Sequence, residues 1–191
     1  MRRSRHGGHT SPHRASGAER IGPASDANVF LRPGEVWFAD SPARVKTVLG
    51  SCVAITMRVP RLSLAAMTHC LLPSAAVRPE TLPRAEALKY VDATIGILIE
   101  SFASRGATIS ELEVKLIGGA DNLQPNGSPS FYSVGERNVR MAIDGLAARG
   151  ITPSVAIVGG RTGRVLVFDS ATGDIYVKRL TKPPRPLEED L

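Results

Sequence analysis

The sequence lacks the features that mark small secreted proteins and membrane-spanning proteins. It has two cysteines in 191 residues, too few for a disulfide framework. No run of about 18 apolar residues occurs, which predicts no transmembrane helix. The basic N-terminus is not followed by the apolar stretch of a secretory signal. We therefore expect a cytoplasmic protein. Its core should be built mostly from aliphatic side chains, because aromatic residues make up only 5% of the chain.

The formal net charge of +6 does not by itself indicate a nucleic-acid-binding protein. Five arginines lie within residues 1–26, a segment rich in Ser, Gly, His and Pro that is predicted to be a disordered basic arm. Residues 181–191 are predicted to be a flexible tail. The predicted single folded domain, residues 27–180, shows no basic stripe interleaved with aromatic residues. We therefore expect neither a nucleic-acid partner nor membrane insertion.

Hydrophobic periodicity predicts several strands and two substantial helices in residues 27–180. The clearest helix covers Ala85–Ser104, where apolar residues recur mostly at steps of three and four. A second helix follows Ser133, because Ser133 and Glu136 have capping-box spacing, and it ends at Gly150. The predicted strands are Val36–Ala39, Val45–Leu49, Val53–Val59, Leu64–Leu72, Glu113–Ile117, Val155–Val158, Val165–Phe168 and Ile175–Val177. This mixture indicates a layered domain of the α/β or α+β class.

Histidine is scarce in the predicted domain, which restricts its chemistry. His69 is the one histidine in residues 27–180, and Cys52 and Cys70 are the two cysteines. Cys52 follows Gly50-Ser51 between two predicted strands, where a sharp turn can place backbone amides near an oxyanion. A thiolate favoured by an imidazolium can attack an amide carbonyl, expel ammonia and leave a thioester for water to hydrolyse. The alternative is that both side chains are ordinary core residues, because free cysteine is commonly buried.

Two other kinds of site are disfavoured. Two cysteines and one histidine give only three soft zinc ligands, and the adjacent His69 and Cys70 should point to opposite faces of a strand. We therefore expect Cys70 to be a core residue. The run Gly159–Arg164 lacks the Gly-Lys-Ser/Thr ending of a phosphate-binding loop. We expect no metal and no cofactor.

Segments spread over roughly residues 29–179 together resemble the chemoreceptor glutamine deamidases of the CheD family. They are Thr47–Ala54, Met67–Pro73, Tyr90–Asp92, Ile117–Ala120, Ser133–Asn138, and Val158–Arg164 with Phe168-Asp169 and Thr172-Gly173. The resemblance implies a β-sheet sandwich flanked by two main helices, with the cysteine and the histidine meeting at one edge. Cys70 departs from the family pattern, which usually has an apolar residue there.

The resemblance also implies roles for individual residues. Cys52 would be the nucleophile, His69 the general base and acid, and Thr47 the residue that orients the imidazole. The residues implied to shape the substrate pocket are Ser51, Gly118 and Gly119. The implied activity is that of a protein-glutamine glutaminase acting on bacterial chemoreceptors, with methylesterase activity on the same sites. The alternative is a non-catalytic chemotaxis adaptor that binds a CheC-type phosphatase of the response regulator.

Overall fold

The computed structural model describes residues 29–75, 81–121 and 133–180. The strands are β1 (Val29–Phe30), β2 (Val36–Ala39), β3 (Arg44–Leu49), β4 (Val53–Val59), β5 (Leu64–Thr68), β6 (Glu113–Gly118), β7 (Val155–Val158), β8 (Arg164–Asp169) and β9 (Ile175–Arg179). The helices are α1 (Arg84–Ala87), α2 (Val91–Ala103) and α3 (Val134–Ala147), with short 3₁₀ helices at Pro60–Leu62 and Ile109–Glu111. The predicted arm, residues 1–26, and the predicted tail, residues 181–191, lie outside the described residues, so the domain limits stay a prediction.

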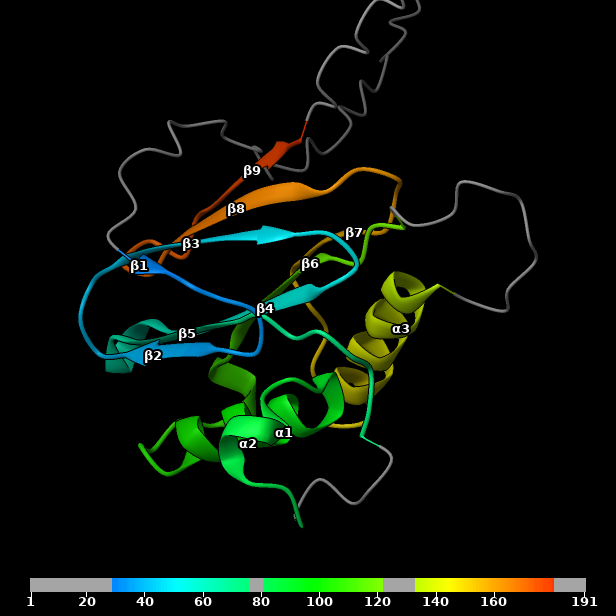
Figure 1. Ribbon diagram of the computed structural model, residues 1–191. Helices are drawn as coiled ribbons and strands as arrows, with labels where there is room; N and C mark the ends of the chain where they lie inside the picture. Colours follow the sequence, from blue (N-terminus) through cyan, green and yellow to red (C-terminus); the bar gives the residue numbers. More distant parts are fainter. Residues whose placement is uncertain (1–28, 76–80, 122–132, 181–191) are drawn as a thin grey trace, which may run out of the picture.

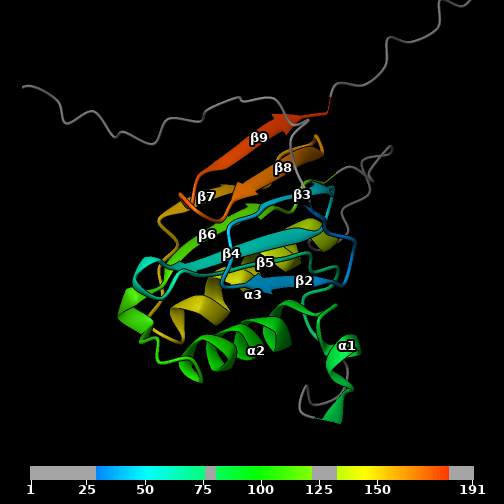
Figure 2. The ribbon, with the colours of Figure 1, turned by 90° about the vertical axis from the view of Figure 1, so that its left-hand side faces the viewer.

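The strands form two sheets, and the helices cover one of them. Sheet A has the order β1-β3-β8-β9, and sheet B has the order β2-β5-β4-β6-β7. Sheet A lies on one face of sheet B, and α2 and α3 lie on the other face (Figures 1 and 2). The predicted layered fold, a β-sandwich flanked by two main helices, is confirmed. Within the three described segments, no helix combines the length and the apolar character needed to cross a membrane.

Sheet B is the middle layer, and the alternation of its residues shows this. In β4, Val53, Ile55 and Met57 belong to the core cluster that packs against the helices. Ala54, which alternates with them, belongs to the cluster between the two sheets. The same alternation continues in β5, where Ala66 faces the helices and Met67 faces sheet A. In β4 and β5, successive residues therefore point alternately toward the helices and toward sheet A.

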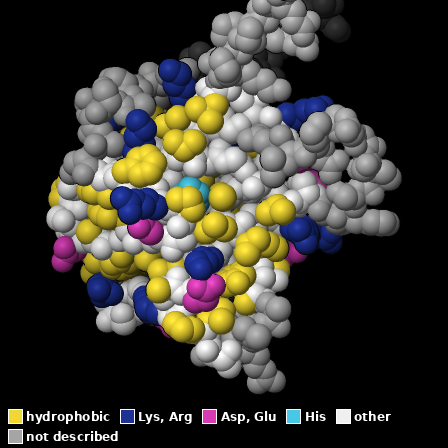
Figure 3. Space-filling model, viewed as in Figure 1, with side chains coloured by type: hydrophobic (Ala, Val, Ile, Leu, Met, Phe, Trp, Pro, Cys, Tyr) yellow, Lys and Arg dark blue, Asp and Glu magenta, His cyan; other side chains and the backbone are white. Residues whose placement is uncertain are grey.

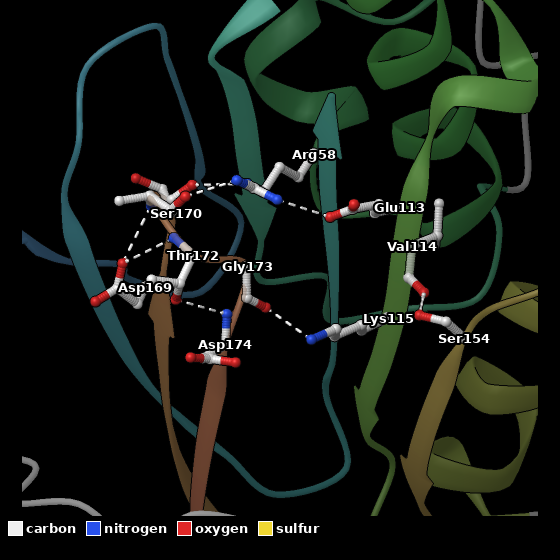
Figure 4. A network of polar contacts seen from close by, with 11 residues as sticks. Arg58, Glu113, Val114, Lys115, Ser154, Asp169, Ser170, Thr172, Gly173 and Asp174 are labelled. Atoms are coloured by element: carbon white, nitrogen blue, oxygen red, sulfur yellow. Dashed lines mark hydrogen bonds and ion pairs between the residues drawn. The ribbon is translucent and has the colours of Figure 1, made fainter. Parts of the chain in front are cut away.

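Polar contacts join the two sheets at the end opposite the β3–β4 turn (Figure 4). Arg58 of β4 donates to the carbonyl oxygens of Ser170 and Ala171 in the β8–β9 hairpin, at 3.1 and 2.6 Å. It also pairs with Glu113 of β6, at 2.9 Å. The Lys115 ammonium donates to the carbonyl oxygen of Gly173, at 2.7 Å. These contacts satisfy carbonyl groups of the hairpin and fix sheet A over sheet B.

The structure corrects two predicted boundaries. The predicted helix Ala85–Ser104 is interrupted between α1 and α2, where Tyr90 has extended backbone (φ −106°, ψ 134°). The break leaves backbone groups free to pair: the Leu72 N–H donates to the Lys89 carbonyl, and the Val91 N–H donates to the Leu72 carbonyl. The predicted strand Leu64–Leu72 ends at Thr68 and continues only as isolated bridges. The broken helix therefore supports the segment that follows His69.

Candidate active site

The turn that carries Cys52 is held against the end of β6. The Ala120 N–H donates to the carbonyl oxygen of Gly50 at 2.8 Å, and the Gly119 N–H donates to that of Cys52 at 2.7 Å. Gly118 has a φ of +121°, and a Cβ at this position would lie 2.3 Å from the Cys52 carbonyl oxygen. Only glycine fits so close an approach in this backbone conformation. The turn that carries Cys52 therefore depends on the glycine pair at the end of β6.

Cys52 and His69 lie on the same face of sheet B. Val53 and Cys70 exchange two backbone hydrogen bonds, at 3.1 and 2.9 Å, and both side chains pack in the helix-side core. Because successive side chains alternate between faces, Cys52 and His69 point to the opposite side, toward sheet A. They are diagonal neighbours across the strand pair, a relation that places Cα atoms about 7–8 Å apart. The structure thus brings together the two groups on which the Cys–His hypothesis depends.

The imidazole of His69 is almost completely buried, and its Nε2 atom is buried as well. His69 is only 2% exposed, and Cys52 is half-buried. Figure 3 shows the histidine colour at the surface near the middle of the face, surrounded by hydrophobic side chains.

Hydrogen bonds to Thr47 fix the tautomer of His69. The Thr47 hydroxyl donates to the carbonyl oxygen of Leu31 at 2.8 Å and lies 2.7 Å from His69 Nδ1. A hydroxyl has one proton, so once it donates to Leu31 it must accept from Nδ1–H. Nε2 then carries the lone pair, and it has no hydrogen-bond partner among the described residues. We infer that the free nitrogen of the imidazole is ready to accept a proton.

Burial keeps the resting cysteine and histidine neutral. Desolvation raises the pKa of the Cys52 thiol above its ordinary value, and a smaller opposing effect comes from the residue's own backbone N–H. Desolvation also lowers the pKa of His69, although the Leu31 carbonyl and Glu35 partly oppose this. The pairing of thiolate with imidazolium considered from the sequence is therefore disfavoured at rest.

Cys70 is a core residue, as predicted. It is fully buried within the helix-side cluster, and its sulfur lies 3.7 Å from the Thr68 hydroxyl oxygen. Burial raises the pKa of its thiol to about 11. Cys70 therefore lacks both the exposure and the ionisation needed for a nucleophile.

Comparison with known proteins identifies the family. The family model described as "CheD chemotactic sensory transduction" matches residues 71–179. A relative from Geobacter sulfurreducens, named probable chemoreceptor glutamine deamidase CheD 2, is 44% identical over 155 residues, which cover 81% of this chain and 91% of the relative. The chain belongs to the CheD family.

Other CheD relatives match over a similar length. Those from Maridesulfovibrio salexigens and Nitratidesulfovibrio vulgaris are each named probable chemoreceptor glutamine deamidase CheD. They are 41% and 39% identical, cover 81% and 83% of this chain, and are themselves covered over 92% and 81% of their length. The Geobacter alignment spans 155 of 191 residues, so it must include residues 37–155 wherever it begins. The similarity to CheD proteins therefore extends over the segments that carry Thr47, Cys52 and His69.

The three residues predicted to shape the pocket of this CheD protein lie in or next to the turn that carries Cys52. Gly119 uses its N–H on the Cys52 carbonyl, so this amide cannot serve as an oxyanion donor in the observed conformation. A Cβ on Gly119 would meet Val139 of α3 at 2.2 Å. Ser51 contributes a backbone carbonyl to a hydrogen bond from Asn138. These contacts assign Gly118 and Gly119 to the support of the turn, and their role toward substrate stays a prediction.

Asn138 was not singled out from the sequence, although it joins the two halves of the site. Its fully buried side-chain amide donates to the carbonyl oxygens of Ser51 and Leu71, each at 2.9 Å. Ser51 precedes Cys52, and Leu71 lies two residues after His69. A signal was present: Asn138 is a polar residue on the buried face of a helix, in line with Gly135 and Ala142.

We expect replacement of Asn138 by alanine to destabilise the fold markedly. The carbonyls of Ser51 and Leu71 would lose a buried donor, which should cost roughly 2–4 kcal/mol of unfolding free energy. Urea unfolding followed by circular dichroism would measure the change. Arg137→Ala, at the exposed neighbouring position, is the matched control and should change stability little. Equal stability of the two variants would contradict the bridging role.

Proposed function

We propose that this protein hydrolyses the side-chain amide of specific glutamines on a chemoreceptor, releasing ammonia and leaving glutamate. The names of its relatives support the substrate class and the reaction. One observation carries the assignment to residues. A histidine with its tautomer held by Thr47 and with a free Nε2 lies on the same sheet face as a half-buried cysteine.

In the proposed acylation, His69 Nε2 takes the thiol proton as Cys52 Sγ attacks the amide carbon. The carbonyl oxygen becomes an oxyanion, which needs hydrogen-bond donors. The backbone N–H of Cys52 is a candidate, because it already interacts with the thiol of the same residue and favours negative charge there. The imidazolium then gives its Nε2 proton to the leaving nitrogen. Ammonia departs and a thioester joins Cys52 to the substrate.

In the proposed deacylation, water takes the place that ammonia vacates. Nε2 accepts a proton from this water as its oxygen attacks the thioester carbon, and it returns that proton to Sγ as the thioester breaks. The products are glutamate and a regenerated thiol. Throughout both steps Thr47 accepts from Nδ1–H, so the imidazole keeps its orientation whether neutral or charged.

The test is to incubate the purified protein with the cytoplasmic fragment of a chemoreceptor. We expect ammonia release in step with the conversion of particular glutamines to glutamate, mapped by peptide mass spectrometry. A fragment with those glutamines replaced by asparagine controls for site selection. A fragment that binds but keeps every glutamine would refute the proposal and favour the adaptor function.

Thr47 should be a positioning residue whose hydroxyl contributes to the rate. Thr47→Val keeps the shape of the side chain but removes the acceptor for Nδ1–H. We expect kcat to fall by about tenfold to a hundredfold, because a hydrogen bond to a charged group contributes about 1.5–3 kcal/mol. Thr47→Ser restores the hydroxyl and should recover most of kcat. Steady-state kinetics of ammonia release would measure both, and equal rates for the two variants would exclude this role.

The methylesterase activity and the CheC-type phosphatase partner suggested by the resemblance stay predictions. An ester would follow the same route, because methanol can replace ammonia as the leaving group of the acyl-enzyme step. The cytoplasmic location is likewise part of the proposal. The substrate in the test is the cytoplasmic part of a chemoreceptor, so an enzyme that modifies it has to be in the same compartment.

A further inference from the structure

A basic pocket lies beside the candidate active site and takes no part in the proposed chemistry. It has a volume of about 270 Å³ and is lined by the end of β7, the loop after it, and three arginines, Arg161, Arg164 and Arg179. The loop is the run Gly159–Arg164, which the sequence had excluded as a nucleotide-type phosphate loop. Although this run is not a nucleotide-type phosphate loop, it places Arg161 and Arg164 in the lining of the pocket.

The charges in this pocket are not neutralised by neighbouring carboxylates. Arg164 and Arg179 are direct partners in the β8–β9 register, so two like charges lie side by side. Among the described residues, none of the three arginines forms an ion pair with Asp or Glu. Burial and the charge of Arg179 both lower the pKa of Arg164. Like charges held together without a counterion favour the binding of an anion.

Arg164 is built into the pocket wall, whereas Arg161 and Arg179 are exposed. Arg164 is only 6% exposed, and its guanidinium donates to the carbonyl oxygens of Ile157 and Gly159. Its Nε has no hydrogen-bond partner among the described residues. Arg164 thus shapes the site, and the two exposed arginines are free to approach a ligand.

One wall of the pocket is formed by β7, which lies two strands away from β4, the strand that begins after Cys52. Val53, Gly118 and Val158 are partners across three adjacent strands of sheet B. Neighbouring strands are about 4.8 Å apart, so the end of β7 is about 10 Å from the start of β4. A helical segment of the substrate protein rises about 1.5 Å per residue. A span of about 10 Å along such a segment therefore corresponds to about two turns, or roughly seven residues. Backbone hydrogen bonds from Gly119 to Cys52 and from Gly159 to Gly118 hold this spacing.

We propose that the pocket binds a glutamate side chain of the substrate protein, about two helical turns from the glutamine at Cys52. This inference rests on the proposed deamidase function. Arg161 and Arg179 supply planar donors that match a carboxylate. Each deamidation creates a new carboxylate on the substrate. A helical segment with glutamines two turns apart is therefore modified in order, because the first product improves the binding of the next site.

The test uses two receptor fragments that differ only at the position seven residues from a mapped target glutamine, on either side of it. One carries glutamate there and the other glutamine. With the wild-type protein, we expect KM to be about three- to tenfold lower for the glutamate fragment, with equal kcat, and the difference to shrink as salt is raised. Equal KM values would overturn the proposal, while deamidation of both fragments would leave the proposed function intact. Deamidation of neither fragment would contradict the proposed function itself.

Charge-reversal variants connect the preference to the pocket. The double variant Arg161→Glu, Arg179→Glu should lose the preference for the glutamate fragment and keep kcat. Lys178→Glu makes the same kind of change at the adjacent exposed position of β9, outside the pocket lining, and should keep the preference. If the double variant keeps the preference for the glutamate fragment, the preference comes from another surface and the proposal is wrong. Protection of the wild type against thermal unfolding by inorganic phosphate, with equal KM for the two fragments, would make this a phosphate site and refute the proposal.

Discussion

Replacement of Cys52 by alanine is expected to abolish ammonia release from a chemoreceptor fragment, with a loss in kcat of about 10⁴-fold or more. No other described side chain on that face can form the thioester, because the second cysteine, Cys70, is buried on the helix side of sheet B. The fold should persist, since Cys52 is only half-buried and its hydrogen bonds are made by its backbone. The rate of ammonia release and the circular dichroism spectrum of the same sample would separate lost chemistry from lost structure.

Cys70→Ala provides the matched control for that experiment. It removes the same thiol group from the neighbouring strand but from the opposite face. Deamidation should continue at close to the wild-type rate, with a modest loss of stability from the small cavity. Iodoacetamide adds an independent measurement: it should label the native protein at Cys52 and leave Cys70 unmodified. Activity that persists in Cys52→Ala, or labelling confined to Cys70, would be inconsistent with the proposed mechanism.

Replacement of His69 by glutamine should lower kcat by about 10³-fold or more, because the variant has no group that can carry the proton from sulfur to the leaving nitrogen. Glutamine keeps polar atoms near Thr47, so the buried hydroxyl retains a partner and the fold should be largely preserved. Substrate affinity depends on other contacts, and KM should change much less than kcat. A loss expressed mainly in KM would indicate that His69 binds substrate and does not transfer protons.

The pH profile of the wild type gives a second test of His69. Burial lowers the pKa of His69, so its neutral, proton-accepting form persists below the ordinary histidine value of 6.5. The rate of deamidation should therefore stay constant as pH falls to 6.5 and decline only below it. In His69→Gln the remaining activity should lack this acidic limb. A midpoint above 6.5 would show that an anion near the imidazole outweighs burial.

The sequence predicted the strands of the sandwich well, because their β-branched runs are bounded by glycine, proline and polar turns. Val53–Val59 was predicted at its observed limits, and the capping box at Ser133 forms both of its hydrogen bonds. The placement of Cys70 in the core followed from the alternation of side chains in a strand. Local sequence patterns were sufficient to predict the structure where a residue's environment is determined by its own strand or helix.

Features that depend on distant segments were not visible in the sequence. The break before α2 exists because Lys89 and Val91 pair with Leu72, a contact that helix periodicity cannot reveal. The contact of Thr47 with His69 joins sheet A to the segment after β5, and only the family resemblance suggested it. The roles predicted for Cys52, His69 and Thr47 are compatible with the observed geometry and await the experiments above.

Because Thr47 comes from sheet A while Cys52 and His69 are carried by sheet B, the proposed reactive pair and its orienting hydroxyl are anchored on opposite sides of a hydrophobic interlayer. A shift of one sheet against the other would therefore change the distance between the Thr47 hydroxyl and His69 Nδ1. Substitution of Phe168 or Leu166 in that interlayer is therefore expected to alter the contact between Thr47 and His69. The proposed proton transfer therefore depends on how the two sheets are aligned.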